Sequence, residues 1–365
     1  MSKAKKVLLI IGIIALILGC CGFLFFRYFT APVGKSPDKK QQKKYTKITE
    51  LFYEGTFHNE ADIEGSEHKA APKGEKIKPK EMLAAEKIEK LSRGTKGELK
   101  LSWLGHSSEL VQMSDQNILI DPVLTKDGKS LQMNGTPRRF SDVPFDIENM
   151  PEIDVVCISH DHFDHLDYGT IIAIDSKVGE YIVPLGVDAI LKGWGIGESR
   201  LHVLNWWESA EIGGIKYTLT PAQHYSGRSV LKRNSTLWGG FYLQDGSHSL
   251  YFTGDTGYYD VFGRIFETLG APDIMLADSG EDSPSWSHMS PDEVVKAAEE
   301  LHTSCLVPVH WGAYLYGSFP WYKPAADIAS EAADSSVTVA FPLIGHIYTV
   351  DELSAQSEFW WESCK

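Results

Sequence analysis

A group of imidazoles and carboxylates follows an apolar run in the first half of the chain. Residues 155–158 read Val-Val-Cys-Ile, and after Ser159 the sequence continues as His160-Asp161-His162-Phe163-Asp164-His165. Such side chains bind divalent metal ions or transfer protons, whereas burying them without partners is costly. His160 and His162 leave an extended segment on the same face, and Asp164 and His165 follow within reach of a second ion. The stretch therefore predicts a site for two metal ions.

Three later strand patterns also end in residues that bind metal ions. They end in His224, in Asp255 and in His310. A single histidine at a strand end is more often structural, but three such ends in one chain favour a shared site. Gly254 and Gly257 flank the second of them and permit a tight turn with close backbone approach. Zinc suits this set of nitrogen and oxygen donors, with iron or manganese as alternatives.

The ordered set of motifs resembles the metallo-β-lactamase superfamily of dinuclear metal hydrolases over residues 98–350. The resemblance implies an α/β fold, a four-layer αββα sandwich with the metals at one edge between its sheets. It implies two Zn²⁺ ions per chain, other divalent metals remaining alternatives. The ligands that it implies are His160, His162 and His224 for one ion and Asp164, His165 and His310 for the other, with Asp255 bridging.

Within the superfamily, the closer likeness is to N-acylphosphatidylethanolamine-hydrolysing phospholipase D. The matching stretches are residues 103–108 (WLGHSS), 121–122 (DP), 137–140 (PRRF), 204–207 (LNWW), 251–258 (YFTGDTGY), 288–291 (HMSP) and 310–312 (HWG). The likeness implies hydrolysis of such lipids to phosphatidic acid and N-acylethanolamine by a hydroxide that bridges the metals. Asp164 and Asp255 would orient this hydroxide, and His288 would lie near the substrate phosphate. Phe163 is a departure, since a family enzyme has Tyr there, and it leaves head-group selectivity open.

Two other functions remain as alternatives. One is a sugar-lactone or sugar-phosphate hydrolase of the same fold, and the other is a non-catalytic metal-binding envelope protein, which all seven ligands disfavour. We expect His106 to be a hydrogen-bonding residue and His346 to be structural. Arg138 and Arg139 either hold a phosphate or pair with surface acids. The aromatic residues within 311–322 are expected to be partly core and partly a loop beside the metals that lines an acyl groove.

An apolar segment near the N-terminus predicts a membrane anchor. Residues 7–26 contain no charge and lie between Lys6 and Arg27. Twenty apolar residues suffice for a helix to cross a bilayer. We expect an uncleaved single-pass anchor within residues 1–29. The alternatives are a cleaved signal peptide and a lipoprotein signal, because residues 17–20 (ILGC) resemble a lipobox. Basic residues lie on both sides, so the side of the membrane that the body occupies stays open.

Charge is distributed unevenly along the chain. Residues 1–47 carry a net charge of +9 and the remainder −23, which together give the −14 of the whole chain. The acidic body argues against nucleic acid as a partner, whereas the basic segment suits a membrane surface. We therefore expect a phospholipid substrate and a membrane as partners, and a homodimer is left open. The five cysteines show no disulfide framework.

The remaining patterns divide the chain into parts. Residues 30–97 are rich in Lys, Glu, Gly and Pro and predict a linker and N-terminal extension that wraps onto the body, with a solvated charge run and short helices around 81–91. A hydrolase domain at 98–350 and a C-terminal tail at 351–365 follow. Helices are expected at 258–269 and 291–301. The expected strands are 100–104, 109–113, 117–121, 154–159, 181–184, 201–206, 216–220, 237–243, 249–253, 274–277 and 306–309.

Overall fold

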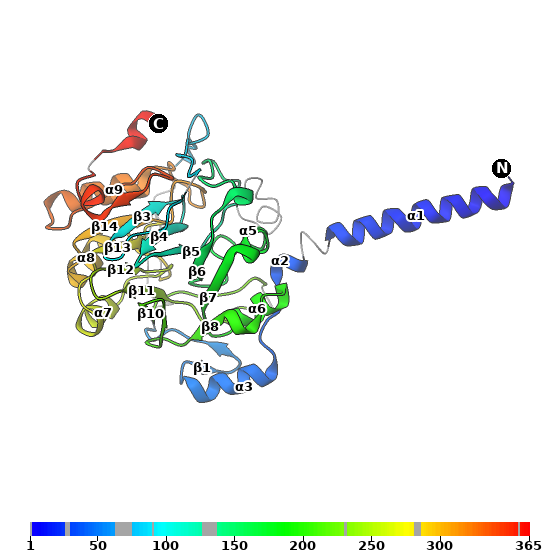
Figure 1. Cartoon of the computed structure of the whole chain (residues 1–365), viewed down its shortest axis with the longest axis horizontal. Helices are drawn as coiled ribbons and strands as arrows, with labels where there is room; N and C mark the ends of the chain where they lie inside the picture. The colour runs from blue at the N-terminus through cyan, green and yellow to red at the C-terminus, as the bar shows by residue number, and fades with distance from the viewer. Residues whose placement is uncertain are drawn as a thin grey trace.

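The fold is given by a computed structural model that describes residues 2–25, 30–62, 75–89, 91–125, 137–229, 232–280, 286–356 and 358–365. Two β-sheets face each other at its centre (Figure 1). One has the strand order β15-β3-β4-β5-β6-β7-β8 and the other β14-β13-β12-β11-β10-β9. The strands of the first are β3 (Leu99–Trp103), β4 (Glu109–Met113), β5 (Gln116–Ile120), β6 (Ile153–Cys157), β7 (Val178–Pro184), β8 (Leu201–Leu204) and β15 (Tyr348–Thr349). Those of the second are β9 (Ser209–Ile212), β10 (Ile215–Thr220), β11 (Gly240–Gln244), β12 (Ser249–Phe252), β13 (Ile274–Asp278) and β14 (Cys305–Val309).

Each sheet combines antiparallel hairpins with parallel strands. Strands β3, β4 and β5 are antiparallel, and β5 to β8 are parallel. In the second sheet β9 to β12 are antiparallel and β12 to β14 are parallel. The two-residue turn between β4 and β5 places Ser114 at φ 46° and Asp115 at φ 67°. Positive φ at both central residues suits the right-handed twist of a hairpin.

The pattern of β6 shows how the layers are held together. Val155 and Cys157 pack into the core between the sheets, whereas Val156 and Ile158 pack under the helices on the outer face. Side chains alternate across a strand, so a strand covered on both faces is apolar throughout. Complete burial of each such aliphatic side chain contributes about 1.5–3 kcal/mol.

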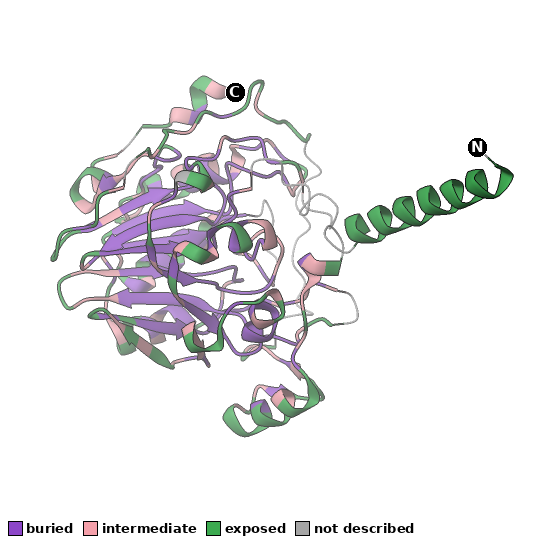
Figure 2. Cartoon of the chain, turned by 45° about the vertical axis from the view of Figure 1, so that its right-hand side comes forward, coloured by how far each residue is buried: buried purple, intermediate pink, exposed green. Residues whose placement is uncertain are grey.

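Helices cover the outer faces of both sheets. The first sheet carries α5 (Tyr168–Ile174) and α6 (Val187–Trp194), and the second carries α7 (Val261–Leu269), α8 (Pro291–Leu301) and α9 (Lys323–Glu331) (Figure 1). Figure 2 shows the strands as the buried layers of the molecule. The α8 helix begins at a capping box in which Ser290 and Glu293 satisfy each other's backbone N–H groups. The predicted αββα sandwich is confirmed.

The predicted strands all overlap observed ones, and the predicted helix at 291–301 is α8. Strands β9 and β15 and helices α5, α6 and α9 were not predicted. Single turns of 3₁₀ helix occupy Ile147–Asn149, Asp175–Lys177, Glu198–Arg200 and Ala332–Asp334. The tail contains α10 (Val350–Ser354) and a 3₁₀ segment at Trp360–Cys364, and Trp361 is buried in the core between the sheets.

The N-terminal part begins with helix α1 (Lys3–Phe25), none of whose residues is buried (Figure 2). Its length and composition are sufficient to cross a membrane. The last residue of the expected span, Phe26, lies outside the described residues, as do 27–29.

The N-terminal extension is partly folded. It contains α2 (Ala31–Val33), α3 (Lys39–Ile48) and a hairpin of β1 (Phe52–Tyr53) and β2 (Thr56–Phe57). Tyr45, Phe52 and Phe57 belong to the buried core, so the segment wraps onto the body and is more than a solvated tether. The helices expected around 81–91 are wrong for the residues described there. Leu83 forms a parallel bridge with Ser141. Hydrogen bonds with residues 140–144 satisfy the backbone of this segment in an extended conformation, so it does not form a helix.

Candidate metal centre

The carboxyl ends of several strands meet at one edge of the sandwich. Strand β6 is followed by the His160–His165 loop, β10 by His224, β12 by Asp255 and β14 by His310. The ends of parallel strands lie at the same edge of a sheet, and open α/β sheets bind ligands there. Gly254, at φ 62°, lets the chain turn sharply before Asp255, where a Cβ atom would lie 2.6 Å from the Gly239 carbonyl oxygen. The fold therefore brings together all seven predicted metal ligands.

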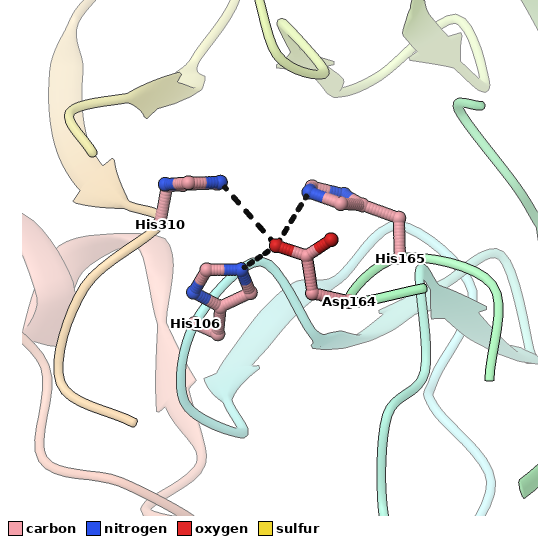
Figure 3. A group of neighbouring side chains, drawn as sticks. All are labelled: His106, Asp164, His165 and His310. Atoms are coloured by element: carbon pink, nitrogen blue, oxygen red, sulfur yellow. Dashed lines mark hydrogen bonds and ion pairs between the residues drawn. The ribbon is translucent and has the colours of Figure 1, made fainter. Parts of the chain in front are cut away.

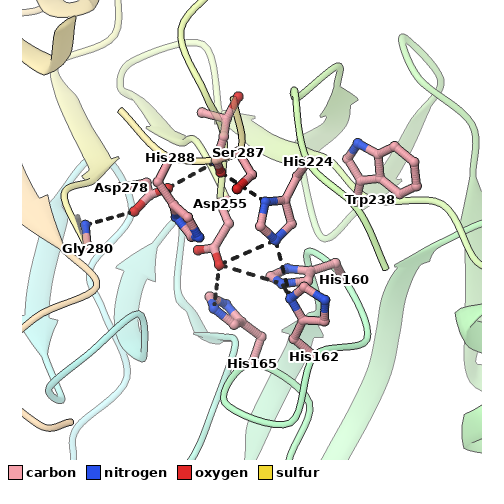
Figure 4. Close-up of polar contacts among 12 residues, drawn as sticks. His160, His162, His165, His224, Trp238, Asp255, Asp278, Gly280, Ser287 and His288 are labelled. Carbon is pink, nitrogen blue, oxygen red and sulfur yellow. Dashed lines mark hydrogen bonds and ion pairs between the residues drawn. The ribbon is translucent and has the colours of Figure 1, made fainter. Parts of the chain in front are cut away.

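Three imidazoles form the first cluster, defined as His160, His162 and His224 (Figure 4). His162 Nδ1 lies 2.9 Å from His160 Nε2 and 3.2 Å from His224 Nε2. The rings of His160 and His224 are both nearly perpendicular to that of His162. Nitrogen atoms that converge in this way from three directions form one face of a tetrahedral metal site.

The second cluster is His106, Asp164, His165 and His310 (Figure 3). Asp164 Oδ2 lies 3.1 Å from His106 Nε2, 3.9 Å from His310 Nε2 and 4.0 Å from His165 Nε2. A carboxylate only accepts hydrogen bonds, so His106 donates its Nε2–H to Asp164. This contact agrees with the expectation that His106 is a hydrogen-bonding residue.

Asp255 connects the two clusters through one oxygen (Figure 4). Its Oδ2 lies 3.1 Å from His165, 3.3 Å from His310, 3.6 Å from His224 and 3.7 Å from His160, in each case measured to Nε2. Its Oδ1 is buried and has no hydrogen-bond partner among the described residues. A buried carboxylate oxygen without a hydrogen bond is costly unless a cation binds it.

Asp121, at the end of β5, orients the imidazoles of the His160–His165 loop. It accepts hydrogen bonds from the Ser159 backbone N–H and hydroxyl and from His165 Nδ1 at 2.8 Å. The Ser159 hydroxyl oxygen in turn lies 2.9 Å from His160 Nδ1. With Nδ1 held in this way, His160 and His165 direct Nε2 toward the centre of the site. Carboxylate–histidine pairs of this kind orient the ligands of metal sites.

Asp278, the last residue of β13, has the same function on the facing sheet. It accepts from His288 Nδ1 at 2.7 Å and from the Thr256 backbone N–H at 3.0 Å, and it lies 3.9 Å from His310 Nδ1. The sequence analysis named neither Asp278 nor Asp121 as a site residue. The available signal was a carboxylate directly after a strand pattern, the same signal that identified Asp255.

His288 lies beside both clusters. Its ring centre is 5.1 Å from those of His224 and His310, and its side chain keeps 13% of its exposure. Its location is compatible with the expected contact to a substrate phosphate, which stays a prediction.

The charges of the site are set by burial and by mutual contact. Burial lowers the pKa of His160 and His224 well below the ordinary value, which keeps both imidazoles neutral. Burial also acts to lower the pKa of His165, but the carboxylates of Asp255 and Asp121 outweigh it and raise that pKa well above the usual range. Burial acts to raise the pKa of Asp255, yet the neighbouring imidazoles hold it well below the ordinary value. The carboxylate is therefore ionised.

The donor set fits two divalent metal ions. Imidazole nitrogens and carboxylate oxygens are ligands of zinc, manganese and iron. Hydrogen bonds between the described residues do not explain why one oxygen of Asp255 faces both clusters, nor why its Oδ1 is buried without a partner. Metal ions would account for both features. His165 faces Asp121 with Nδ1 and Asp255 with Nε2. Binding of a metal ion to Nε2 would displace the proton from that nitrogen.

Arg228 forms hydrogen bonds to the backbone of the His160–His165 loop and of the residue that follows it. Its guanidinium donates to the carbonyl oxygens of Asp161 and Leu166, both at 2.7 Å, and is buried. It stacks 4.1 Å above the ring of Phe163. The ring at this position therefore packs on an arginine of the protein, a role that needs no hydroxyl group.

Among the described residues, Arg139 contacts backbone carbonyl oxygens and forms no ion pair with an acid. Its buried guanidinium donates to the carbonyl oxygens of Leu104, Val123, Ser141 and Asp142. Arg138 is exposed. The role of Arg139 is to hold loops together.

The remaining residues named in the sequence analysis are the aromatic residues of 311–322 and His346, which lie in the core, beside the site or at the surface. Trp311, Phe319 and Trp321 belong to the buried core, whereas the Tyr314 and Tyr316 rings lie 5.0 and 5.8 Å from His106. His346 pairs with Glu86 at the surface, 2.8 Å apart, as expected for a structural residue.

Comparison with known proteins agrees with this geometry. Residues 116–311 match the family described as the beta-lactamase superfamily domain. An uncharacterized protein of Mycobacterium tuberculosis is 38% identical over 259 residues, which cover 69% of each chain. The N-acyl-phosphatidylethanolamine-hydrolyzing phospholipase D 1 of Caenorhabditis elegans is 33% identical over 248 residues, 64% of this chain and 69% of that protein. Among solved structures, a metallo hydrolase from Ignicoccus hospitalis has a TM-score of 0.53 at 22% identity and covers 69% of this chain and 97% of its own.

Proposed function

Because the chain belongs to the beta-lactamase superfamily and is a metal-dependent hydrolase, we propose that it cleaves the phosphodiester bond of N-acylphosphatidylethanolamine-like phospholipids. The products would be phosphatidic acid and an N-acylethanolamine. The observation that carries the proposal is Asp255 Oδ2, which faces two imidazoles of each cluster within 3.7 Å. A carboxylate oxygen that faces both clusters is suited to a site that holds two metal ions close together. The likeness to the nematode phospholipase D supports the choice of substrate.

The proposed metals are two zinc ions, held by the three imidazoles of the first cluster, by Asp164, His165 and His310 of the second, and by Asp255. When bound, two such ions would acidify a water molecule and offset the charge that develops on a phosphate. The protein supplies orientation. His106 donates a hydrogen bond from its Nε2–H to Asp164 Oδ2 and fixes that carboxylate, while Asp121 fixes His165. Asp164 and Asp255 then present ionised oxygens that orient the attacking water.

His288 is proposed to bind the substrate phosphate. Asp278 holds its Nδ1, so the ring stays between His224 and His310, where a phosphate bound at the two clusters would lie. This contact would offset part of the negative charge that the lipid brings to an acidic protein.

A second cation for the phosphate is proposed at Arg233, now that Arg139 has another role. Its guanidinium carbon lies 4.6 Å from the centre of the Tyr225 ring, and that ring lies 4.6 Å from His162. Arg233 is exposed, and Trp286 flanks the same ring at 5.6 Å. Arginine combines stacking on aromatic faces with recognition of phosphate groups. This group is suited to a charged head group that approaches the first cluster.

The membrane anchor belongs to the same proposal. Helix α1 is exposed along its whole length and apolar enough for a bilayer. An anchor there would keep the hydrolase beside a lipid substrate.

The test is analysis of lipid products from purified protein with two equivalents of zinc, after chelation, and after reloading. Turnover should disappear with the metal and return with it; turnover that survives complete metal removal would sink the proposal. His310→Ala should abolish activity, and His346→Ala, at a surface histidine, should leave it unchanged. Rates on a soluble phosphodiester and on a sugar lactone that exceed the rate on micellar lipid would favour the alternative hydrolase.

A further inference from the structure

The N-terminal extension reaches two of the loops that carry the candidate metal ligands. We propose that this extension, residues 30–62, is a positioning element for the first cluster and sets the affinity of the metal bound there. The inference rests on the proposed two-metal site. It concerns residues outside the domain match at 116–311, in a segment whose composition predicted a linker that wraps onto the body.

Asn59 holds the backbone of His224. Its side-chain Nδ2 donates to the His224 carbonyl oxygen at 2.9 Å, and the His224 backbone N–H donates to Asn59 Oδ1 at 3.0 Å. The buried Trp238 indole donates to the same Oδ1 at 3.2 Å, which orients the amide. His224 Nδ1 is held at the other end by the Ser287 carbonyl oxygen at 2.9 Å. Backbone and ring of this ligand are thus both fixed, the backbone by a residue of the extension.

Arg228 makes the second connection. Its Nε donates to the Pro32 carbonyl oxygen at 2.8 Å, while its Nη1 donates to Asp161 and Leu166 on the loop that carries His162. A single buried guanidinium therefore joins the extension to the metal-binding loop.

The extension is itself docked firmly enough to transmit these contacts. The Trp194 indole donates to the Ala31 carbonyl oxygen at 2.7 Å, and Gly34 packs so closely on Ile190 that a Cβ atom would lie 2.6 Å from its Cγ2. Phe57 is buried in the core two residues before Asn59, and its backbone N–H bonds to the Asn234 carbonyl oxygen at 2.8 Å. These contacts hold both ends of the extension against the domain.

The second cluster also has orienting contacts within the domain. Asp121 holds His165, and Asp278 faces His310, and both lie within the domain. Loss of a group that orients a ligand typically weakens metal binding by about 10- to 100-fold. Among the ligands, Asn59 contacts only His224, which belongs to the first cluster. We therefore expect loss of the Asn59 contacts to weaken one metal site of the two. The extension also lies between α1 and the domain, so it connects the proposed anchor to the metal centre.

The experiment is chelator competition on the full-length protein loaded with two zinc ions, in detergent and without lipid. In Asn59→Ala, one zinc equivalent should bind roughly 10- to 100-fold more weakly than in the wild type and should therefore be removed by a weaker chelator. The other zinc equivalent should bind with wild-type affinity. Gln41→Ala is the matched control, because Gln41 caps α3 and contacts Asp188 without touching a metal-binding loop. It should retain both zinc ions with wild-type affinity.

Wild-type retention of both ions in folded Asn59→Ala would overturn the inference. Equal weakening of both ions would overturn it as well, because that pattern indicates a general loss of stability. If Asn59→Ala does not fold, Asn59→Asp decides by the same criteria, since it keeps the acceptor oxygen for His224 and Trp238. A wild-type protein that binds two zinc ions but hydrolyses no lipid would refute the proposed function and leave this inference standing.

Discussion

The Asp121→Asn substitution tests how far the metal centre depends on residues that touch no metal. Asp121 is buried and accepts the Nδ1–H of His165 at 2.8 Å as well as two hydrogen bonds from Ser159. An asparagine keeps the shape but offers one acceptor oxygen in place of two. If that oxygen remains with Ser159, the amide N–H faces His165 and selects the tautomer that carries its proton on Nε2. That nitrogen then has no lone pair for a metal.

The magnitude follows from the contact that is lost. A hydrogen bond to a charged group contributes about 1.5–3 kcal/mol, and about 1.4 kcal/mol is a tenfold change in an equilibrium constant. Zinc at the second cluster should therefore bind roughly 10- to 100-fold more weakly, which agrees with the usual effect of removing an orienting carboxylate. Hydrolysis at limiting zinc should fall by a similar factor.

Zinc titration of the metal-free protein with a competing fluorescent chelator measures this effect directly. Asp154→Asn is the matched control, since Asp154 lies at the opposite end of β6 and pairs with the exposed Arg93. The control should bind zinc as the wild type does. Unchanged zinc affinity in a folded Asp121→Asn protein would refute the orienting role.

Three further predictions follow from other contacts. Arg139→Ala should lower the free energy of unfolding by roughly 3–5 kcal/mol, because it leaves buried carbonyl oxygens without partners. Arg138→Ala, the control, should change it by about 0.5 kcal/mol or less. Urea titration measures both values, and an effect of Arg139→Ala confined to KM would contradict the structural role of Arg139. Glu109 is buried with both carboxylate oxygens unpaired among the described residues, and burial raises its pKa well above the ordinary value. The contribution of the protonated Glu109 to the free energy of unfolding is therefore complete below its unfolded pKa and is lost as pH rises through the folded pKa. In Glu109→Gln, the free energy of unfolding should therefore fall less steeply with pH above about pH 4.5. Denaturant titrations at several pH values in which both proteins lose stability equally steeply with pH would disprove this. Arg233→Ala should raise KM for anionic phospholipid by about tenfold with a smaller change in kcat, and an unchanged KM would exclude the phosphate contact.

Much of the site was accessible from local sequence patterns. His160, His162, Asp164 and His165 follow an apolar strand pattern, and the strand is β6 as observed. Asp255 and His310 were found in the same way, since strand length and polarity are properties of short segments. Asp121 and Asp278 fulfil the same criterion but lack the flanking glycines that drew attention to Asp255, so their contacts with His165 and His288 were missed.

Arginine roles were the least accessible. Arg138 and Arg139 are adjacent and chemically identical, yet one is exposed and the other is buried among four carbonyl oxygens. The direction in which a side chain points, and the loops that surround it, depend on how distant segments pack.

The sequence by itself determined which residue types stand at strand ends and the apolar segment of α1, because apolar periodicity and strand length are local. The four-layer class of the fold came from the resemblance of its motifs to the metallo-β-lactamase superfamily. The resemblance implied that Asp255 bridges the metals, and the tertiary structure shows that one of its oxygens faces both clusters, which requires β12 and β6, in different sheets, to end at the same edge. It also decided that Asn59 meets His224, 165 positions along the chain. Contacts of this kind depend on sheet pairing and on the packing of one layer against another, which no short stretch of sequence specifies.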